Sequence, residues 1–390
     1  MSWTPVANAG LPFGRAGSGV IGDYFYVFGS LLSPQGEAYN WDTEHWQLST
    51  PPLFGCCNYC GISTGEAIYL IGWYADYQIG GEVQKFTPTV PPSGEWTEVS
   101  SYPIDACGIG GAWDGGNYIY ACGGGSMTEI FDYAYKYDIS ADNWIPIADL
   151  PVPMMYHGGA FIDGSYHIMG GVMEEGIAHF AYDPATNSWT EKSSLPIPNY
   201  FASFSITQNA GYIISCGGGG GYYIWSATDA VQLYDPENDS WIQENPLPVA
   251  FGMNSAGLMP NGHVISAGGF DNGYKQSTFR GEGFPGSSAS LIPGRGKSGG
   301  HLPDAAQINS VYPNPFNSTA KIEFTIMTVG HYSLSVFNTE GNLVKDIFDG
   351  ELSQGDYCSD FNGEKLAAGV YFVRLSSNNY SQVFKLLFTK

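Results

Sequence analysis

The sequence predicts an all-β fold in more than one domain, and three observations lead to this prediction. Short apolar segments alternate with turn residues, and no apolar run keeps the period of a helix. The 390 residues include 53 Gly, 27 Tyr, 22 Phe and 10 Trp, with only 13% charged residues, which is typical of an all-β extracellular chain. Tryptophans that open strands return at a nearly constant interval before residue 280.

The repeated unit is clearest at residues 166–189, YHIMGGVMEEGIAHFAYDPATNSW. A short apolar strand ends in Gly170-Gly171, and a polar loop and a second strand follow. A turn with Asp183-Pro184 then leads to a third strand that opens on Trp189. Asp and Pro favour the turn through side-chain capping and a fixed φ. The Gly pair lets the backbone bend where a side chain would clash.

Six copies of this unit precede residue 280. The strand-opening Trp returns roughly every 47 residues, which is the period of a four-stranded meander in a propeller. These residues are Trp3, Trp46, Trp96, Trp144, Trp189 and Trp241. Each copy also has a glycine signal, at Gly29, Gly72, Gly123-Gly124, Gly170-Gly171, Gly217-Gly218 and Gly268-Gly269. The pattern predicts a six-bladed β-propeller over residues 1–280.

The two ends of the repeat region predict how the ring closes. Trp3 has the outer-strand signature but no blade before it, and the sixth blade has no Trp after Gly268-Gly269. We therefore expect residues 2–6 to supply the outer strand of blade six. This pairing would remove the free edges that an open sheet leaves.

The Gly pair, the Tyr-Asp turn and the Trp together resemble Kelch repeats over roughly residues 1–280. The Tyr-Asp turn is present in three copies, at Tyr137-Asp138, Tyr182-Asp183 and Tyr234-Asp235. Blades one and two depart from the pattern, because Gly29-Ser30 and Gly72-Trp73 replace the Gly pair. The resemblance implies a Kelch-like propeller and says little about function, since propellers serve many unrelated functions.

Residues 281–307 are rich in Gly, Ser and Pro, so we expect them to form a linker. Residues 308–390 return to short strands and turns, which predicts a small β-sandwich. The YPNPFN start, the NTEGNLV turn and the LAAGVYFVRL strand resemble the C-terminal sorting domain of bacterial type IX secretion substrates. That resemblance implies an Ig-like sandwich, an interaction with the secretion machinery and an extracellular or cell-surface location. Because Met1 leads straight into Ser2 without a signal peptide, we also expect a leader upstream of Met1.

Charge and motifs exclude several classes of function. With 37 acidic and 14 basic residues the net charge is -23, which argues against nucleic acid and anionic membranes as partners. No stretch approaches the 18 apolar residues of a membrane span, so no membrane insertion is expected. The chain contains no P-loop motif, and the glycine run Gly217–Gly221 is followed by no predicted helix, so it does not predict a phosphate-binding loop and we expect no cofactor.

The seven cysteines do not form a metal-binding pattern. Cys57 and Cys60 make a lone CxxC with no second CxxC and no His at ligand spacing, so no metal site is expected. Cys122 and Cys216 precede Gly pairs and are expected to be core thiols. A disulfide among Cys56, Cys57, Cys60 and Cys107 is possible, and its pairing stays open.

Candidate ligand-binding residues are predicted on one face of the ring. In a meander, the segments that lead into the inner strands and the loops between the second and third strands share that face. Aromatic rings beside amides and carboxylates suit sugars, which offer a C–H face and hydroxyls together. The alternative is that these rings only fill the space between blades. The candidates are Arg15, Tyr59, Trp73, Asp105, Tyr156, His157, Tyr200, Tyr222, Tyr223, Trp225 and Asn254.

Arg15 is the only arginine in the repeats before residue 280. An unpaired guanidinium there could hold a carboxylate bidentately, whereas the alternative is a structural bridge between blades. His157 is the only His at the start of an inner strand, so a copper site with two His ligands is not expected.

The leading hypothesis is a secreted or surface-displayed protein that binds a glycan or an extracellular protein without catalysis. A second hypothesis is a sialic-acid-type mutarotase or epimerase that uses Arg15 and Asp105. A third is a structural subunit of an extracellular assembly.

Overall fold

The computed structural model describes residues 2–172, 176–202, 206–209, 211–219, 227–284, 306–312, 316–326, 329–338, 342–353, 355–363, 366–377 and 380–389. The chain divides into two compact units, Met1–Gly294 and Arg295–Lys390, and each is described by itself. Most of the predicted linker lies outside the described residues, so the linker stays a prediction. Among the described residues, no helix has the length and apolar composition that a membrane crossing requires.

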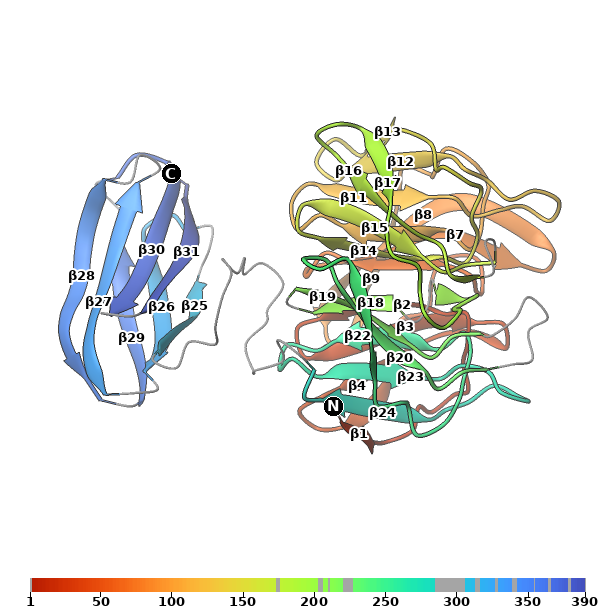
Figure 1. The fold of residues 1–390 in the computed structure, drawn as a ribbon, viewed down its shortest axis with the longest axis horizontal. Coiled ribbons are helices and arrows are strands. Elements are labelled where there is room, and N and C mark those ends of the chain that lie inside the picture. Colours follow the sequence, from red (N-terminus) through yellow and green to blue (C-terminus); the bar gives the residue numbers. More distant parts are fainter. Residues whose placement is uncertain are drawn as a thin grey trace. The chain divides into compact units, whose positions relative to one another are not determined.

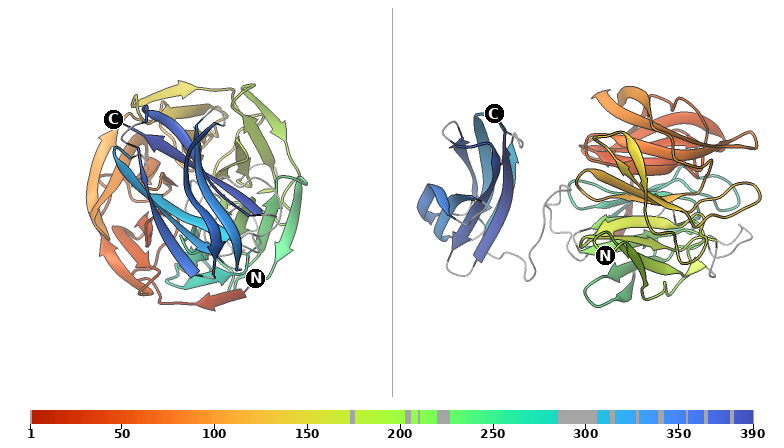
Figure 2. Two further views of the ribbon diagram at one scale, coloured as in Figure 1. Left: turned by 90° about the vertical axis from the view of Figure 1, so that its left-hand side faces the viewer. Right: turned by 90° about the horizontal axis from the view of Figure 1, so that it is seen from above.

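The first unit is a ring of six four-stranded antiparallel sheets, the predicted six-bladed Kelch-like propeller (Figures 1 and 2). Blade one holds β2 (Gly17–Ile21), β3 (Tyr24–Ser30), β4 (Ser33–Asn40) and β5 (His45–Ser49). Blade two holds β6 (Cys60–Ser63), β7 (Ile68–Ala75), β8 (Gln78–Val90) and β9 (Ser93–Val99). Blade three holds β10 (Gly110–Trp113), β11 (Tyr118–Cys122), β12 (Ala134–Asp138) and β13 (Asn143–Pro146).

The remaining three blades have the same strand order. Blade four holds β14 (Gly158–Ile162), β15 (Ser165–Met169), β16 (His179–Asp183) and β17 (Ser188–Glu191). Blade five holds β18 (Ile206–Asn209), β19 (Tyr212–Cys216), β20 (Val231–Asp235) and β21 (Ser240–Glu244). Blade six holds β22 (Ser255–Leu258), β23 (Val264–Ala267), β24 (Thr278–Glu282) and β1 (Ser2–Pro5).

Blade six is completed by the amino-terminal strand. β1 pairs antiparallel with β24, and Trp3 lies opposite Gly281. This is the pairing predicted from the position of Trp3. An added Cβ on Gly281 would lie 2.8 Å from the Trp3 ring, so only glycine leaves room for the indole there. The two ends of the propeller sequence therefore share one sheet, as closed rings require.

The glycine signals bend the chain where neighbouring blades approach each other. Gly170 and Gly171 have φ of +71° and +91°, in the left-handed region that favours glycine. An added Cβ on Gly170 would lie 2.4 Å from the carbonyl oxygen of Asn199. The predicted bend at the Gly pair is thus required both by the backbone angle and by close packing.

The six repeat tryptophans hold the linkers between blades. Each indole N–H donates to a backbone carbonyl in the linker that leads into the inner strand of its own blade, at 2.7–3.1 Å. The accepting residues are Asn245, Ala7, Thr50, Ser100, Ala148 and Ser193. A buried indole usually finds such a partner, because an unpaired N–H is costly. The tryptophan period therefore reflects one repeated hydrogen bond.

In blades three, four and five a second side chain hydrogen-bonds the same linker residue. Asp142, Asn187 and Asp239 each accept the backbone N–H of the residue whose carbonyl bonds the Trp, at 2.8–3.0 Å. The same oxygens accept the buried hydroxyls of Tyr137, Tyr182 and Tyr234. We call the resulting units Asp142/Trp144, Asn187/Trp189 and Asp239/Trp241 the linker clamps. They explain why the tyrosine of the Tyr-Asp signal and the Trp occur together.

The second unit is a β-sandwich. One sheet has the order β25 (Ala306–Tyr312), β26 (Thr319–Ile326) and β29 (Gly355–Asn362). The other has the order β28 (Leu343–Leu352), β27 (Gly330–Asn338), β30 (Gly369–Ser377) and β31 (Tyr380–Phe388). Residues from both sheets, such as Phe324 and Val336, share one buried core. The assignment of this sandwich to the Ig-like class stays a prediction.

Three histidines are buried inside the propeller. His157, His167 and His179 are 0–3% exposed. His167 Nδ1 lies 3.0 Å from His179 Nε2, so one ring donates a hydrogen bond to the other. Burial lowers the pKa of His157 and His167 to about 3 and that of His179 to about 4. All three side chains are therefore neutral at physiological pH.

We predict that Trp189→Phe lowers the free energy of unfolding by about 0.5–1.5 kcal/mol, because the partly buried carbonyl of Ala148 loses its donor. Urea unfolding followed by fluorescence measures this. The control is Trp113→Phe, since the Trp113 indole bonds only the carbonyl of Gly116 within its own turn. A loss from Trp113→Phe as large as that from Trp189→Phe would contradict the importance of the linker clamp.

We also predict that stability falls as the pH drops below about 6.5. In that range the unfolded histidines bind protons while the buried ones stay neutral until pH 3–4, so each costs up to about 1.4 kcal/mol per pH unit. His157→Met should make the dependence of Tm on pH shallower between pH 6.5 and 4. Replacing the exposed His45 by Gln serves as the control and should leave the slope unchanged. An unchanged slope in His157→Met would refute this account of the buried ring.

Candidate functional site

A ladder of backbone hydrogen bonds runs around the inner rim of the propeller. Arg15 N donates to Met253 O at 3.2 Å, Asn58 N to Arg15 O at 2.8 Å, and Gly108 N to Asn58 O at 3.3 Å. The ladder continues with Tyr156 N donating to Gly108 O at 2.7 Å. All five residues have φ between +58° and +66°. This conformation is unfavourable for a side-chain-bearing residue, so the ladder fixes each one just before its inner strand.

Arg15 lies in the rim ladder with a partly exposed side chain. Its Nε is 3.1 Å from the sulfur of Met253, and its guanidinium carbon lies 5.9 Å from the centre of the Phe201 ring. No carboxylate lies within ion-pair distance of Arg15 among the residues that the structure describes. The guanidinium is therefore held by a soft sulfur and a ring, and most of its donors are left for another partner.

An apolar cluster surrounds this guanidinium. Phe201 and Met253 are buried, and Tyr156, Tyr200 and Phe270 pack against them. The rings of Tyr156 and Phe201 are 5.2 Å apart. The structure thus brings together three predicted site residues, Arg15, Tyr156 and Tyr200. We call these three residues with Phe201, Met253 and Phe270 the Arg15 cluster.

Titratable groups beside the Arg15 cluster are neutral at physiological pH. Burial raises the pKa of the Cys107 thiol to about 11, although the Tyr156 hydroxyl, which hydrogen-bonds this thiol, and the Arg15 charge oppose the rise. Burial also raises the pKa of Tyr156 above its usual value. The cluster therefore presents one fixed positive charge among neutral groups. This arrangement suits the binding of an anionic group over an apolar floor.

Three predicted site residues lie inside the molecule and not on the surface. Tyr59, His157 and Asn254 are at most 1% exposed. The Tyr59 hydroxyl donates to the carbonyl of Phe54 at 2.8 Å, and Asn254 Nδ2 donates to the carbonyl of Cys216 at 2.8 Å. Each side chain comes one residue after a rim residue, so it points the other way, between two blades. The prediction that they lie on the surface was wrong by one residue, because successive side chains of an extended segment point in opposite directions.

The other predicted residues are dispersed or lie outside the described chain. Trp73 is partly buried, and its indole N–H donates to Glu82 at 2.7 Å. Asp105 is exposed and accepts the N–H of Gly81 at 3.1 Å, and no ion pair joins it to Arg15 among the described residues. Tyr222, Tyr223 and Trp225 lie outside the described residues, so their role stays a prediction.

Two residues near the guanidinium were not predicted. Phe201 follows Tyr200 directly, and Cys107 was considered only as a disulfide candidate. Aligning the blades on their left-handed rim residues would have found Cys107, which immediately precedes Gly108. The same alignment does not find Phe201. Blade five has no described residue with positive φ just before its inner strand, so it cannot be aligned with the other blades in this way.

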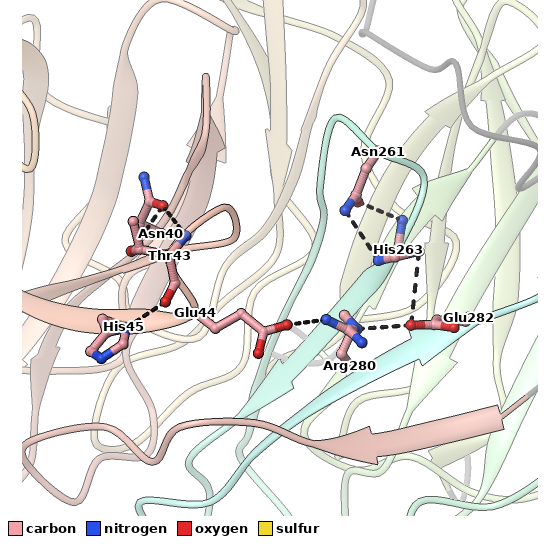
Figure 3. Close-up of polar contacts among 8 residues, drawn as sticks. All are labelled: Asn40, Thr43, Glu44, His45, Asn261, His263, Arg280 and Glu282. Atoms are coloured by element: carbon pink, nitrogen blue, oxygen red, sulfur yellow. Dashed lines mark hydrogen bonds and ion pairs between the residues drawn. The ribbon is translucent and has the colours of Figure 1, made fainter.

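Arg280 shows what a structural arginine does in this propeller. Its side chain lies between Glu44 of blade one and Glu282 of blade six (Figure 3), and the Nε–Oε1 distance to Glu282 is 2.8 Å. Glu44 stands where Asp142 stands in the blade-three clamp, five residues after the blade tyrosine. Because Glu44 pairs with Arg280, the buried hydroxyl of Tyr39 has no hydrogen-bond partner in the described structure. Arg280 therefore bridges the two blades at which the ring closes.

A shallow hollow lies beside blade one. Its lining includes Phe13, Ser30, Gln35 and Glu37. Burial raises the pKa of Glu37, whose Oε2 accepts the N–H of Leu11 at 3.1 Å. The carboxyl thus fastens the linker into blade one. In the described part of the chain, no group of three His, Cys, Asp or Glu side chains is arranged to hold a metal ion.

Comparison with known proteins identifies parts of both units. The model of the secretion system C-terminal sorting domain matches residues 310–389, which cover most of the β-sandwich. The Kelch motif matches residues 115–151, which contain three strands of blade three. These matches agree with the two resemblances found in the sequence.

Curated Kelch proteins are similar to between half and two thirds of the chain. Kelch repeat and BTB domain-containing protein 1 of Vaccinia virus (strain Copenhagen) is 28% identical over 217 residues, 53% of this chain and 37% of the viral protein. Kelch-like protein 25 of Xenopus tropicalis is 24% identical over 263 residues, 63% of this chain and 43% of that protein. The chain therefore spans less than half the length of these relatives. It contains a Kelch motif, has Kelch-repeat relatives and carries a C-terminal type IX secretion sorting domain, which indicates export to the cell surface or the extracellular space.

Proposed function

We propose that the propeller is an extracellular binding domain that recognises a protein partner through its rim face, with an acidic group of the partner bound by Arg15. The observation that carries this proposal is the unpaired state of Arg15. The chain has 37 acidic residues, yet none of those described pairs with this guanidinium. Arg280, by contrast, has two carboxylate partners.

Rigidity of the rim supports the proposal. The backbone of Arg15 is held on both sides by the rim ladder, and its side chain rests on Met253 and Phe201. A guanidinium that is already positioned loses little conformational freedom when it binds a carboxylate in a bidentate manner. Binding therefore requires little rearrangement of the propeller.

Exposed apolar side chains on the same face favour a protein partner. Leu31 and Leu32 are 44% and 59% exposed between β3 and β4, and Tyr77 is 81% exposed between β7 and β8. Met127, in the corresponding loop of blade three, is 62% exposed. Tyr and Met are enriched in protein interfaces, and apolar tips on three neighbouring blades offer a contact surface on the face that also carries Arg15.

Glycan recognition is the principal alternative. Its strongest sequence signal, Tyr222, Tyr223 and Trp225, lies outside the described residues. The mutarotase hypothesis needs Arg15 and Asp105 at one site, and Asp105 is instead bound to the backbone of Gly81. The proposed assembly role has no described feature that favours it over partner binding.

The prediction is tested with two arrays probed by the purified full chain, one of short peptides that carry Asp or Glu beside apolar residues and one of neutral and acidic glycans. We expect acidic peptides to bind, and Arg15→Ala to weaken binding at least about ten-fold, because a charge-assisted pair is lost. Arg15→Lys should restore binding only in part, since it keeps the charge and loses the planar fork.

Lys192→Ala is the matched control, because it removes one positive charge from blade four and leaves the rim intact. Its peptide binding should equal that of the unmodified chain. Binding to glycans alone would replace the protein proposal by the glycan alternative. Peptide binding that survives Arg15→Ala would show that the Arg15 cluster is not the binding site.

A further inference from the structure

Two neighbouring thiols lie beside the Arg15 cluster, at the start of blade two. The Sγ atoms of Cys56 and Cys57 are 3.8 Å apart. Both approach the same acceptor, the carbonyl oxygen of Tyr74, at 3.1 Å and 3.8 Å. Neighbouring side chains of an extended strand point to opposite faces, so this placement needs an explanation in the backbone.

The backbone curls at this point. The N–H groups of Cys56 and Cys57 both donate to the carbonyl of Tyr74, each at 3.2 Å. The flanking residues Gly55 and Asn58 have φ of +77° and +60°. Consecutive N–H groups that converge on one acceptor keep the two side chains on one side of the chain. The corresponding pairs in blades one, three, four and six are Phe13-Gly14, Ala106-Cys107, Met154-Met155 and Phe251-Gly252, so only blade two among these has two thiols.

We propose that Cys56 and Cys57 are a redox-modification site, at which a disulfide-bearing oxidant outside the cytoplasm converts the dithiol to a disulfide between neighbouring residues. The sorting domain indicates an extracellular or cell-surface location, where disulfides form and persist. This proposal does not depend on the proposed binding function.

The reaction balances as two thiol–disulfide exchanges. Cys56 is only partly buried, so its thiol reaches the oxidant first, loses its proton to solvent, attacks one sulfur and displaces one thiolate, which takes up a proton. The Cys57 thiol then loses its proton to solvent and attacks the Cys56 sulfur, which expels the second thiolate. The oxidant disulfide is reduced to two thiols, and the two cysteines are oxidised to one disulfide.

The disulfide would be labile. The Cα atoms of neighbouring residues are about 3.8 Å apart, below the range of about 4.4–6.8 Å that unstrained disulfides prefer. Strained disulfides are reduced more easily and are typically regulatory. Oxidation would fix the segment next to Asn58, whose N–H bonds the carbonyl of Arg15, so the state of this pair is coupled to the rim ladder.

The test uses the reduced full chain treated with oxidised glutathione, then unfolded in denaturant, labelled with N-ethylmaleimide and digested with trypsin. One tryptic peptide, residues 16–85, contains Cys56, Cys57 and Cys60, whereas Cys107 and Cys122 lie in residues 86–136. We expect peptide 16–85 to lose the mass of two hydrogens and to carry a single maleimide label. Cys60→Ser should keep the disulfide, and Cys56→Ser and Cys57→Ser should each abolish it.

Circular dichroism checks that the serine variants are folded, and the unmodified chain tests the proposal without them. Three maleimide labels on peptide 16–85 after oxidation would overturn the proposal. A cross-link to peptide 86–136, a disulfide that persists in Cys56→Ser, or a stable glutathione adduct would also overturn it.

Discussion

The propeller depends on the hydrogen bond between each repeat tryptophan and the linker of its blade. This bond joins the outermost strand of a blade to the segment that leads into the innermost strand. Trp46, for example, binds the carbonyl of Ala7, and the chain from Ala7 leads to Arg15. Where a clamp is complete, both polar groups of one linker residue are satisfied at the edge of the core. The tryptophans of the outermost strands therefore help to fix the position of the inner rim.

The rim that these hydrogen bonds help to position carries the candidate site. Backbone hydrogen bonds link five left-handed residues of successive blades, and four of them carry a side chain. Arg15 is the charged member of this series, and it rests on Met253 and Phe201. Its counterpart Arg280 is neutralised at the ring closure. One propeller thus uses one arginine for architecture and, in our proposal, the other for recognition.

Much of the fold could be predicted because its signals are local and repeated. The spacing of Trp and Gly residues reflects a hydrogen bond and a bend that every blade needs, and Trp3 without a blade indicated the closure. The site was harder to predict, since a shift of one residue decides whether a side chain faces the rim or the core. Tyr59, His157 and Asn254 are buried in the core, whereas Arg15, Tyr156 and Tyr200 are partly exposed and their role in binding stays a prediction. Contacts between distant segments, such as Arg15 with Phe201, have no local signal.

The central claim is that Arg15 pairs with no carboxylate of the described residues and is reachable in the free protein, while Arg280 is engaged. Modification of the native chain with phenylglyoxal, followed by peptide mapping, measures this directly for each arginine. Our account predicts that Arg15 reacts several-fold faster than Arg280, and that an acidic ligand protects Arg15 alone. Equal protection of the two arginines in the ligand-free chain would contradict it.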